Sequence, residues 1–350
     1  MKKQAHAWIE ITEKTLGTYL DFSVNTNPLG IPSAVIQNLS QLAQVAGHYP
    51  DPDCRILSTA LADAYDIPAS ALLCGNGAED LLYRLIGAVM PQNALIIEPT
   101  FEEYRRVLTL SGCQIQTYQL CPEKQFLLDE KILSVIDDSL DMLFLCNPNN
   151  PTGNLVSSYL LDEIIDKCQK NNILLAADEC FLEFIPDWNH HTLKHCAAAS
   201  HHLIVVDAFT KTYALAGFRL GFCISGNAAL LRSMKTQGPE FAVSVPAQLA
   251  GISALEDTSY MQRTAAFLAA ERDWLFSQLH ALPIQIWPSQ GNYLLFRTSC
   301  PHIREALLKQ GITVRDCSRF YGLGPDYCRI SIKHREENEI LVRVLQDILT

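Results

Sequence analysis

The sequence predicts an α/β protein with a large domain on a mostly parallel sheet and a smaller α+β domain at the C-terminal end. Two observations support this prediction. Between residues 94 and 224, short apolar runs typical of buried strands alternate with longer segments of helical periodicity, which is the pattern of successive βαβ units. After Gly238-Pro239 this alternation stops, so we expect a domain boundary near residue 240.

The composition is that of an ordinary soluble enzyme, with 350 residues, 48% of them hydrophobic and 19% charged. A formal net charge of −11 argues against a general nucleic-acid binder, because no basic block is available to replace counterions. No apolar run is long enough to span a membrane, and no apolar segment follows Lys2-Lys3 as a secretory signal requires. A cytoplasmic location is therefore expected.

Twelve cysteines raise the question of metal or disulfide sites, but the sequence contains no Cys-x-x-Cys pair. Cys146 and Cys223 lie inside apolar runs, where a thiol behaves as a small hydrophobic group. The histidines between residues 190 and 202 have spacings that match no zinc template and indicate a surface turn. We expect neither a metal nor a disulfide.

The first part of the chain is expected to form an N-terminal arm over residues 1–40 that packs with the small domain. The large domain follows over 41–240 and the small domain over 241–350. Ser33 is a good N-cap and predicts a helix to about residue 46, followed by the rigid turn Tyr49-Pro-Asp-Pro52 and a helix to residue 65.

Gly75-Asn-Gly-Ala-Glu-Asp80 opens an apolar helix predicted over 81–90. Glycines just before a helix leave its first backbone amides free, and free amides at the positive end of a helix bind anions. The third glycine of a dinucleotide fingerprint is absent. The alternatives are thus an anion site or an ordinary helix cap.

The remaining elements follow from apolar runs and helical periodicity. Strands are predicted at 94–98, 113–120, 141–146, 173–179, 203–206, 291–296, 312–315 and 327–333, and helices at 102–111, 159–171, 247–256, 259–279, 302–310 and from 336. Ligands of parallel sheets bind beyond the carboxyl ends of the strands. The loop 147–153, Asp178 and Lys211 all fall at such ends.

Lys211 and Arg219 lie on one loop after the strand 203–206. A lysine at the end of a buried strand can lose its proton through desolvation and become a nucleophilic amine. An arginine on the same loop could hold a phosphate ester. These are the two needs of a pyridoxal phosphate enzyme, although a solvated surface lysine is the common alternative.

Asp178 closes a buried strand, which is costly unless its carboxylate is paired. A protonated pyridine nitrogen would be a suitable partner, whereas without a cofactor Asp178 would cap a helix or form a core salt bridge. Asn150 precedes Pro-Thr-Gly and could donate its amide to the phenolic oxygen of the cofactor. The alternative for Asn150 is a plain turn.

Four motifs together resemble the fold-type-I pyridoxal phosphate enzymes of the class I/II aminotransferase superfamily. They are Asn150-Pro-Thr-Gly153, Asp178-Glu-Cys-Phe181, Thr210-Lys211 and Arg219-Leu-Gly221, in the order and with the spacing of the family. The resemblance covers essentially the whole chain. It implies a seven-stranded, mostly parallel sheet flanked by helices in the large domain, and pyridoxal 5'-phosphate as the cofactor.

The resemblance also implies a role for each matching residue. Lys211 would be the catalytic lysine that forms an imine with the cofactor, Asp178 would pair with the pyridinium, and Asn150 would bond to the ring oxygen. Phe101 would be the aromatic residue that stacks on the ring. The implied phosphate ligands are Arg219, Thr210, Gly77 and Ala78. Tyr49 would reach the cofactor phosphate of the neighbouring subunit in a homodimer.

Two positions depart from the usual family pattern. Phe181 stands where most members place a tyrosine that donates to the phenolic oxygen. Ala208 stands where a serine usually helps to hold the phosphate. The chain therefore lacks two hydroxyl donors that are common at this site.

Two branches of the superfamily fit best. The threonine-phosphate decarboxylases of cobalamin biosynthesis are similar in residues 20–30, 99–104, 292–295 and 327–333, and also in having phenylalanine at position 181. Histidinol-phosphate aminotransferases resemble shorter pieces within residues 27–30, 49–50 and 329–331. The His-Gly-Gly stretch often found near the decarboxylase N-terminus is absent, which puts an N-terminal substrate contact in doubt.

The resemblance implies decarboxylation of L-threonine O-3-phosphate to (R)-1-aminopropan-2-ol O-phosphate and CO₂. The alternative is transamination of histidinol phosphate with glutamate and 2-oxoglutarate. A protein that binds the cofactor without catalysis, such as a regulator, is disfavoured because the sequence shows no DNA-binding segment.

Either substrate is a small phosphorylated amine, so a second anion site is needed. Arg329 and Lys333 are four apart on a predicted strand and would share one face, and Arg315 ends a neighbouring strand. We expect Arg329 to bind a carboxylate, with Lys333 and Arg315 near the substrate phosphate. Asn27 completes the predicted substrate-binding set, and a solvated basic edge strand is the alternative.

Overall fold

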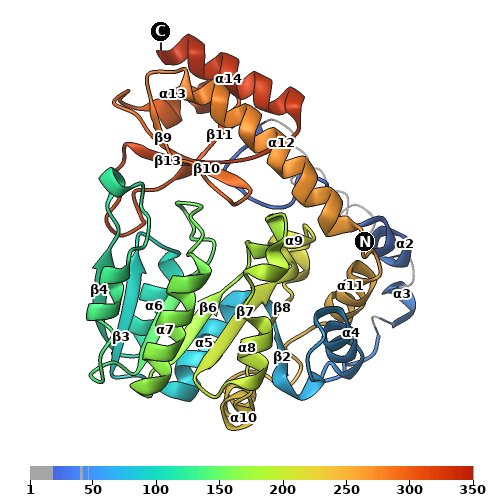
Figure 1. Cartoon of the computed structure of the whole chain (residues 1–350). Helices are drawn as coiled ribbons and strands as arrows, with labels where there is room; N and C mark the ends of the chain where they lie inside the picture. Colours follow the sequence, from blue (N-terminus) through green and yellow to red (C-terminus); the bar gives the residue numbers. More distant parts are fainter. Residues whose placement is uncertain (1–18, 40–41, 46, 350) are drawn as a thin grey trace.

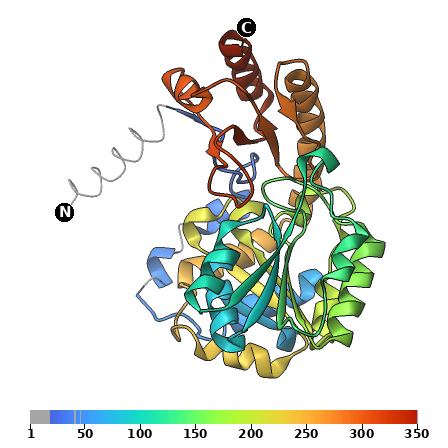
Figure 2. The same cartoon turned by 90° about the vertical axis from the view of Figure 1, so that its left-hand side faces the viewer.

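The computed structural model describes residues 19–39, 42–45 and 47–349. In Figure 1 a small domain built from the C-terminal part of the chain lies above a larger domain that contains the main sheet. Figure 2 shows the same stacking from the side. Residues 1–18 and 40 of the predicted N-terminal arm lie outside the described residues.

The large domain is organised around a sheet of seven strands. Their spatial order is β2 (Leu72–Gly75), β8 (Gly221–Ile224), β7 (Leu203–Ala208), β6 (Leu174–Asp178), β5 (Met142–Cys146), β3 (Asn93–Glu98) and β4 (Gln114–Gln119). β8 runs antiparallel to β2 and β7, and the other neighbouring pairs are parallel. The predicted mostly parallel, seven-stranded sheet is confirmed, although the short strand β2 was not among the predicted strands.

Helices cover both faces of this sheet. One apolar core contains residues of α4 (Arg55–Tyr65), α7 (Ser158–Lys170), α8 (Lys194–Ala199) and α11 (Val245–Leu255). The core on the other face contains residues of α5 (Gly77–Val89), α6 (Glu102–Leu110) and α10 (Ala228–Thr236). α8 occupies part of the His-rich stretch that we expected to be a surface turn, because Leu193 and Ala197 are buried in the first core.

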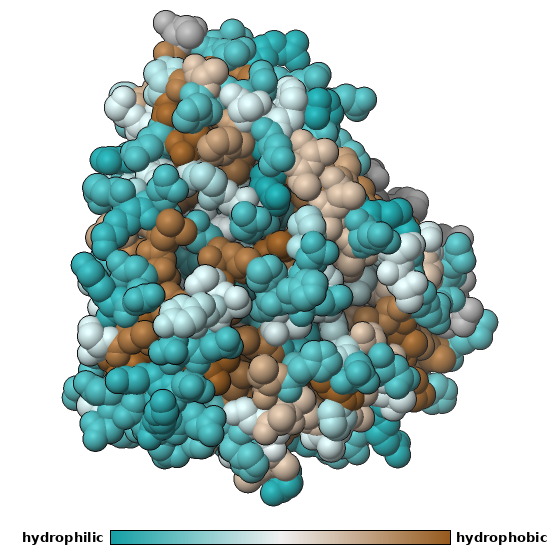
Figure 3. Space-filling model, viewed as in Figure 1, coloured by the Kyte–Doolittle hydropathy of each residue, from teal (hydrophilic) through white to brown (hydrophobic). Residues whose placement is uncertain are grey.

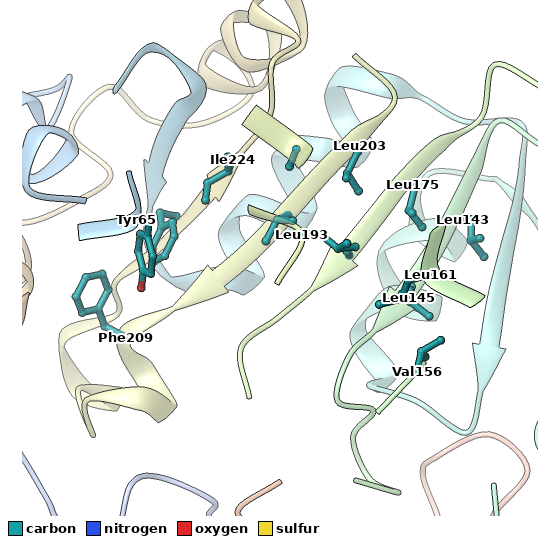
Figure 4. Packing of buried hydrophobic residues seen from close by; sticks show 14 of the residues in the cluster. Tyr65, Leu143, Leu145, Val156, Leu161, Leu175, Leu193, Leu203, Phe209 and Ile224 are labelled. Atoms are coloured by element: carbon teal, nitrogen blue, oxygen red, sulfur yellow. The ribbon is translucent and has the colours of Figure 1, made fainter. Parts of the chain in front are cut away.

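The alternation of side chains along each strand supplies both cores. In β5, Leu143 and Leu145 point to the face covered by α7, and Phe144 points to the face covered by α5 and α6. Figure 4 shows Leu143 and Leu145 in the first core together with Leu175 of β6 and Leu203 of β7. Because every residue of β5 and β7 is buried, these strands hold the loops at their carboxyl ends in fixed positions.

The small domain has its own sheet, in the order β12 (Arg315–Asp316), β13 (Tyr327–Ser331), β10 (Tyr293–Arg297) and β9 (Gln285–Ile286). The helices α12 (Tyr260–His280), α13 (Ile303–Lys309) and α14 (Arg335–Leu349) belong to the same part of the chain. The strand predicted at 312–315 is divided into β11 (Ile312–Thr313) and β12. The strand predicted at 327–333 ends at Ser331.

The N-terminal segment joins the small domain through β1 (Leu20–Asp21), which pairs in parallel with β11. The helix predicted from Ser33 begins there as α2 (Ser33–Leu39) and is followed by α3 (Leu42–Val45). α11 packs against α2 and α4, next to the large sheet. The exact domain boundaries stay a prediction.

The face of the molecule seen in Figure 1 is largely polar, as Figure 3 shows, with apolar side chains visible in patches between hydrophilic ones. Within the described part of the chain, no helix combines the length and the apolar character that crossing a lipid bilayer requires.

Candidate active site

A cavity of about 300 Å³ lies at the carboxyl ends of the parallel strands and reaches the small domain. It brings together most of the predicted site residues. The predicted residues that line it are Ala78, Phe101, Asn150, Asp178, Thr210, Lys211, Arg219, Arg315 and Arg329. A wider depression of about 840 Å³ beside α4 and α12 contains none of them, so we place the chemistry in the smaller cavity.

Lys211 lies on the single-turn helix α9 (Phe209–Thr212), directly after the buried strand β7. The backbone amide of Phe209 donates to the carbonyl of Leu220 at 3.1 Å, which closes the loop that carries both Lys211 and Arg219. Burial and the positive charge of Arg329 lower the pKa of Lys211 to about 8. An appreciable fraction of this amine is therefore neutral, and nucleophilic, near neutral pH.

Asp178 ends β6 and is buried at the cavity. Its Oδ2 accepts a hydrogen bond of 2.5 Å from the hydroxyl of Tyr104, and its Oδ1 accepts one of 3.0 Å from the backbone amide of Cys180. The Tyr104 ring is stacked on Phe144, with 4.9 Å between centroids. The carboxylate is thus held in place while it still faces the cavity.

Tyr104 is a site residue that our sequence reasoning did not assign. A signal was present, because Tyr104 follows Phe101 by three residues at the start of a helix, so both share one face. In the structure the two rings meet edge to face, 5.6 Å apart.

Asn150 is buried, and its Oδ1 accepts a hydrogen bond from Nη1 of Arg329. The second terminal nitrogen of Arg329 donates to the carbonyl of Ser23 at 3.1 Å. Nε of Arg329 has no partner among the described residues, although the side chain is buried. Because buried donors are normally satisfied, this guanidinium lacks an acceptor that an anionic ligand would supply.

A cradle for a second anion lies at the start of α5. Gly77 has a φ of +85°, and Arg219 approaches it so closely that a Cβ on Gly77 would lie 2.8 Å from the arginine Nη2. A Cβ on Gly221 would lie 2.6 Å from the backbone nitrogen of Ala78. The two glycines therefore leave room around the first amides of the helix, where a phosphate is stabilised by free N–H groups and the helix dipole. Thr210 lines the same cavity.

Arg315 and Arg329 form the small-domain side of the cavity. They are direct register partners in the antiparallel pair β12–β13, so their side chains share one face. Nη2 of Arg315 donates to Oε1 of Glu102 at 2.9 Å, which ties β12 to the start of α6 in the large domain. Together with Arg219, these two arginines and Lys211 line one cavity.

Two residues predicted to bind substrate do not line the cavity. Asn27 is buried away from it, with its side-chain amide donating to the carbonyl of Thr212 and the hydroxyl of Thr264 at 2.7 and 2.9 Å. Its backbone amide instead supports the loop of the lysine by donating to the carbonyl of Lys211 at 3.0 Å. Asn27 is therefore placed to hold the loop.

Lys333 is the second of these residues. It follows the end of β13 at Ser331, so the strand that was expected to put it on the face of Arg329 does not reach it. Its Nζ lies 3.4 Å from Oε1 of Glu337, on the first turn of α14.

Tyr49 also lies away from this cavity and is 84% exposed. Its ring contacts Phe241, which is itself 42% exposed, with 4.9 Å between centroids. Within this chain Tyr49 therefore touches no other predicted site residue, and the predicted contact would require a second subunit.

Phe181 and Ala208 line the cavity at the two positions that depart from the family pattern. The Phe181 ring packs edge to face on Tyr293, with 5.1 Å between centroids, and also belongs to the core of the small domain. The wall beside Asp178 is thus apolar at Phe181.

A buried ionic cluster lies under the strand ends. Nζ of Lys194 is 2.8 Å from Oδ2 of Asp207, 3.3 Å from Oε1 of Glu183 and 3.5 Å from Oε2 of Glu179. Burial raises the pKa of Asp207 to about 7, although the charge of Lys194 opposes this. Since Glu179 follows Asp178, and Asp207 lies four residues before Lys211, the cluster fixes the two strand ends that carry the site.

No arrangement of three or more His, Cys, Asp or Glu side chains that could hold a metal ion occurs among the described residues. The twelve cysteines are unpaired.

The donor set of the cavity fits pyridoxal phosphate. This cofactor presents an aldehyde, a basic ring nitrogen, a phenolic oxygen and a phosphate. The cavity offers the Lys211 amine, the Asp178 carboxylate and the Asn150 amide, whose Nδ2 makes no hydrogen bond within the described chain. A side chain at Gly221 would press against the backbone nitrogen of Ala78, so the glycines of the cradle keep this amide accessible to a phosphate.

A family model described as aminotransferase class I and II matches residues 18–345. The threonine-phosphate decarboxylase of Salmonella typhimurium is 38% identical over 335 residues, covering 95% of this chain and 91% of that protein. The histidinol-phosphate aminotransferase of Methanococcoides burtonii is 32% identical over 332 residues, covering 93% and 88%. The crystal structure of the histidinol-phosphate aminotransferase from Clostridium acetobutylicum matches with a TM-score of 0.87 at 27% identity, covering 94% of this chain and 98% of that one.

Proposed function

The chain belongs to the aminotransferase class I and II family, and on this premise we propose that it decarboxylates L-threonine O-3-phosphate to (R)-1-aminopropan-2-ol O-phosphate and CO₂. It has the fold-type-I architecture of these enzymes, and its cofactor is pyridoxal 5'-phosphate. The proposal includes a role of the product in cobalamin biosynthesis. The observation that supports it best is the presence of Arg315 and Arg329 in one cavity with Lys211.

The two arginines match the two anionic groups of threonine phosphate. Arg329 is buried beside Asn150 and suits the carboxylate, which is attached to the reacting carbon. Arg315 is 36% exposed and suits the phosphate at the far end of the substrate. Histidinol phosphate has a phosphate but no carboxylate, so it would leave one of these guanidinium groups without an anion.

The cofactor, when bound, supplies an electron sink for the pair released at Cα. Arg329 holds the carboxylate of the substrate, and the bond between Cα and this carboxylate breaks as CO₂ leaves. Lys211, whose pKa of about 8 allows proton exchange near neutral pH, returns a proton to Cα. Asp178, oriented by Tyr104, would pair with the protonated ring nitrogen of the cofactor.

Transamination of histidinol phosphate is the second candidate. It is supported by the similarity to histidinol-phosphate aminotransferases, at 32% identity in sequence and a TM-score of 0.87 in structure. In that reaction Arg329 would bind a carboxylate of the amino donor glutamate. The two candidate reactions therefore differ in whether the phosphorylated substrate itself carries the carboxylate that Arg329 binds.

We further propose a homodimer in which Tyr49 reaches the cofactor phosphate of the neighbouring subunit. The exposed pair of rings formed by Tyr49 and Phe241 supports this, because large aromatic side chains are enriched in protein interfaces. Light scattering of the wild type and of Tyr49→Ala, together with cofactor titration, tests it. A monomer, or unchanged cofactor affinity in the variant, contradicts it.

The reaction is tested by incubating the cofactor-loaded protein with threonine phosphate and measuring CO₂. A parallel incubation with histidinol phosphate and 2-oxoglutarate is followed by the formation of glutamate. We expect CO₂ in the first assay and no glutamate in the second. Glutamate without CO₂ would replace our proposal with the second candidate, and Lys211→Ala should abolish either activity.

A further inference from the structure

Glu102 is a charged residue near the cavity to which the proposed reaction gives no role. It lies in the first turn of α6, is 27% exposed, and does not line the cavity. Its carboxylate is nevertheless the single hydrogen-bond partner of the Arg315 guanidinium among the described residues. The contact joins the large domain to the small domain at the rim of the cavity.

The register of β12 and β13 explains why Arg315 needs such a partner. Arg315 and Arg329 are directly opposite each other, and like charges in this arrangement repel. Arg329 is buried and fixed by Asn150 and Ser23, so it cannot move away. Arg315 is 36% exposed, and its long side chain can turn into solvent and leave the cavity.

We propose that Glu102 is a positioning residue that holds Arg315 in the cavity and so preorganises the subsite for the phosphate of the substrate. The inference rests on the proposed function, because it assumes a phosphorylated substrate. Glu102 binds the guanidinium from outside the cavity and leaves its other N–H groups available to the ligand. Immobilising such a side chain before binding improves affinity, since the ligand no longer has to order it.

The test compares Glu102→Ala and Glu102→Gln with the wild-type enzyme loaded with its cofactor. KM and kcat are measured for threonine phosphate, and the affinity for unphosphorylated threonine is measured from the visible absorbance of the cofactor. Glu102→Ala should raise KM for threonine phosphate by roughly three- to tenfold and change kcat less than about twofold. Glu102→Gln, which keeps an acceptor at the same place, should restore most of the affinity. Threonine binding should not change.

Glu103→Ala is the matched control. Glu103 lies in the same first turn of α6 and pairs with Arg106 at 2.9 Å, so its removal causes the same loss of charge at the start of the helix. It should leave KM unchanged. The inference is overturned if Glu102→Ala leaves or lowers KM for the phosphorylated substrate, since Glu102 would then be irrelevant or a competitor for Arg315. An equal loss for unphosphorylated threonine would also overturn it.

Failure of the inference is distinguishable from failure of the proposed function. If the wild type does not decarboxylate threonine phosphate but transaminates histidinol phosphate, the proposed function fails. The same comparison of variants is then made with histidinol phosphate, which also carries a phosphate. A KM that is higher in Glu102→Ala than in the wild type still supports the role of Glu102, and an equal or lower KM refutes it.

Discussion

Replacement of Lys211 by methionine should stabilise the cofactor-free protein, although it removes the amine to which the proposed reaction is assigned. Burial and the charge of Arg329 lower the pKa of Lys211 from its ordinary 10.5 to about 8. At 1.36 kcal/mol per pH unit, holding this lysine protonated in the folded protein costs about 3 kcal/mol. Methionine has a similar length and no charge, so the variant should avoid this cost.

The stability difference between Lys211→Met and the wild type should depend on pH. The folded protein binds the proton of Lys211 more weakly than the unfolded chain, so the penalty is fully present below about pH 8. As the pH rises from about 8 to 10.5, the unfolded chain also loses this proton, and the penalty disappears. The stability advantage of Lys211→Met should therefore be about 3 kcal/mol at pH 7 and close to zero near pH 10.5.

Urea unfolding of wild type and variant at several pH values measures this difference, and subtracting the two curves removes the titration of other groups. Lys170→Met, at the exposed last turn of α7, serves as the control, and its free energy of unfolding at pH 7 should stay within about 0.5 kcal/mol of the wild type. A difference for Lys211→Met that is constant with pH, or a variant less stable than wild type at pH 7, would refute the reasoning that desolvation makes this amine nucleophilic.

Three further substitutions test individual parts of the site. Tyr104→Phe keeps the stacked ring but removes the hydrogen bond to Asp178, and should lower the free energy of unfolding by about 1.5–3 kcal/mol; a loss below 0.5 kcal/mol would mean that the bond contributes little. Gly221→Ala places a methyl group against the backbone nitrogen of Ala78, and should weaken cofactor binding at least about tenfold in an absorbance titration; unchanged affinity would place the phosphate elsewhere. Lys194→Met leaves three buried carboxylates without their cation, and should destabilise the protein by about 3–5 kcal/mol at pH 7 in chemical unfolding. The loss of stability should be smaller at pH 5 than at pH 7. Equal losses at the two pH values would contradict the explanation that unpaired buried charges cause the destabilisation.

The parts of the molecule that could be predicted are those that depend on local pattern. The strands that lead to Asp178 and Lys211 are short, apolar and almost entirely buried, so the sequence pattern alone locates the ends on which the proposed catalytic groups lie. Pairs of glycines likewise indicate the start of α5. These features bring Lys211, Asp178 and Arg219 to one cavity because parallel strands present their carboxyl ends at the same edge.

The parts that could not be predicted depend on where strands stop and on contacts between distant segments. The position of Lys333 was inferred from strand alternation, but β13 ends two residues earlier and the side chain turns to Glu337. Strand β2 has only four residues and no pattern of its own. The hydrogen bond of Tyr104 to Asp178 joins residues 74 positions apart, which no local signal contains.

The closed loop between β7 and β8 has a consequence for cofactor retention. Lys211 and Arg219 lie on one short connection whose ends are joined by the bond between Phe209 and Leu220. Under the proposed roles of these two residues, opening of this hairpin would detach the amine and the phosphate-binding guanidinium together, so loosening this segment would not release the coenzyme one end at a time. The rate of hydrogen exchange at the Phe209 amide should then match the rate at which the bound coenzyme dissociates.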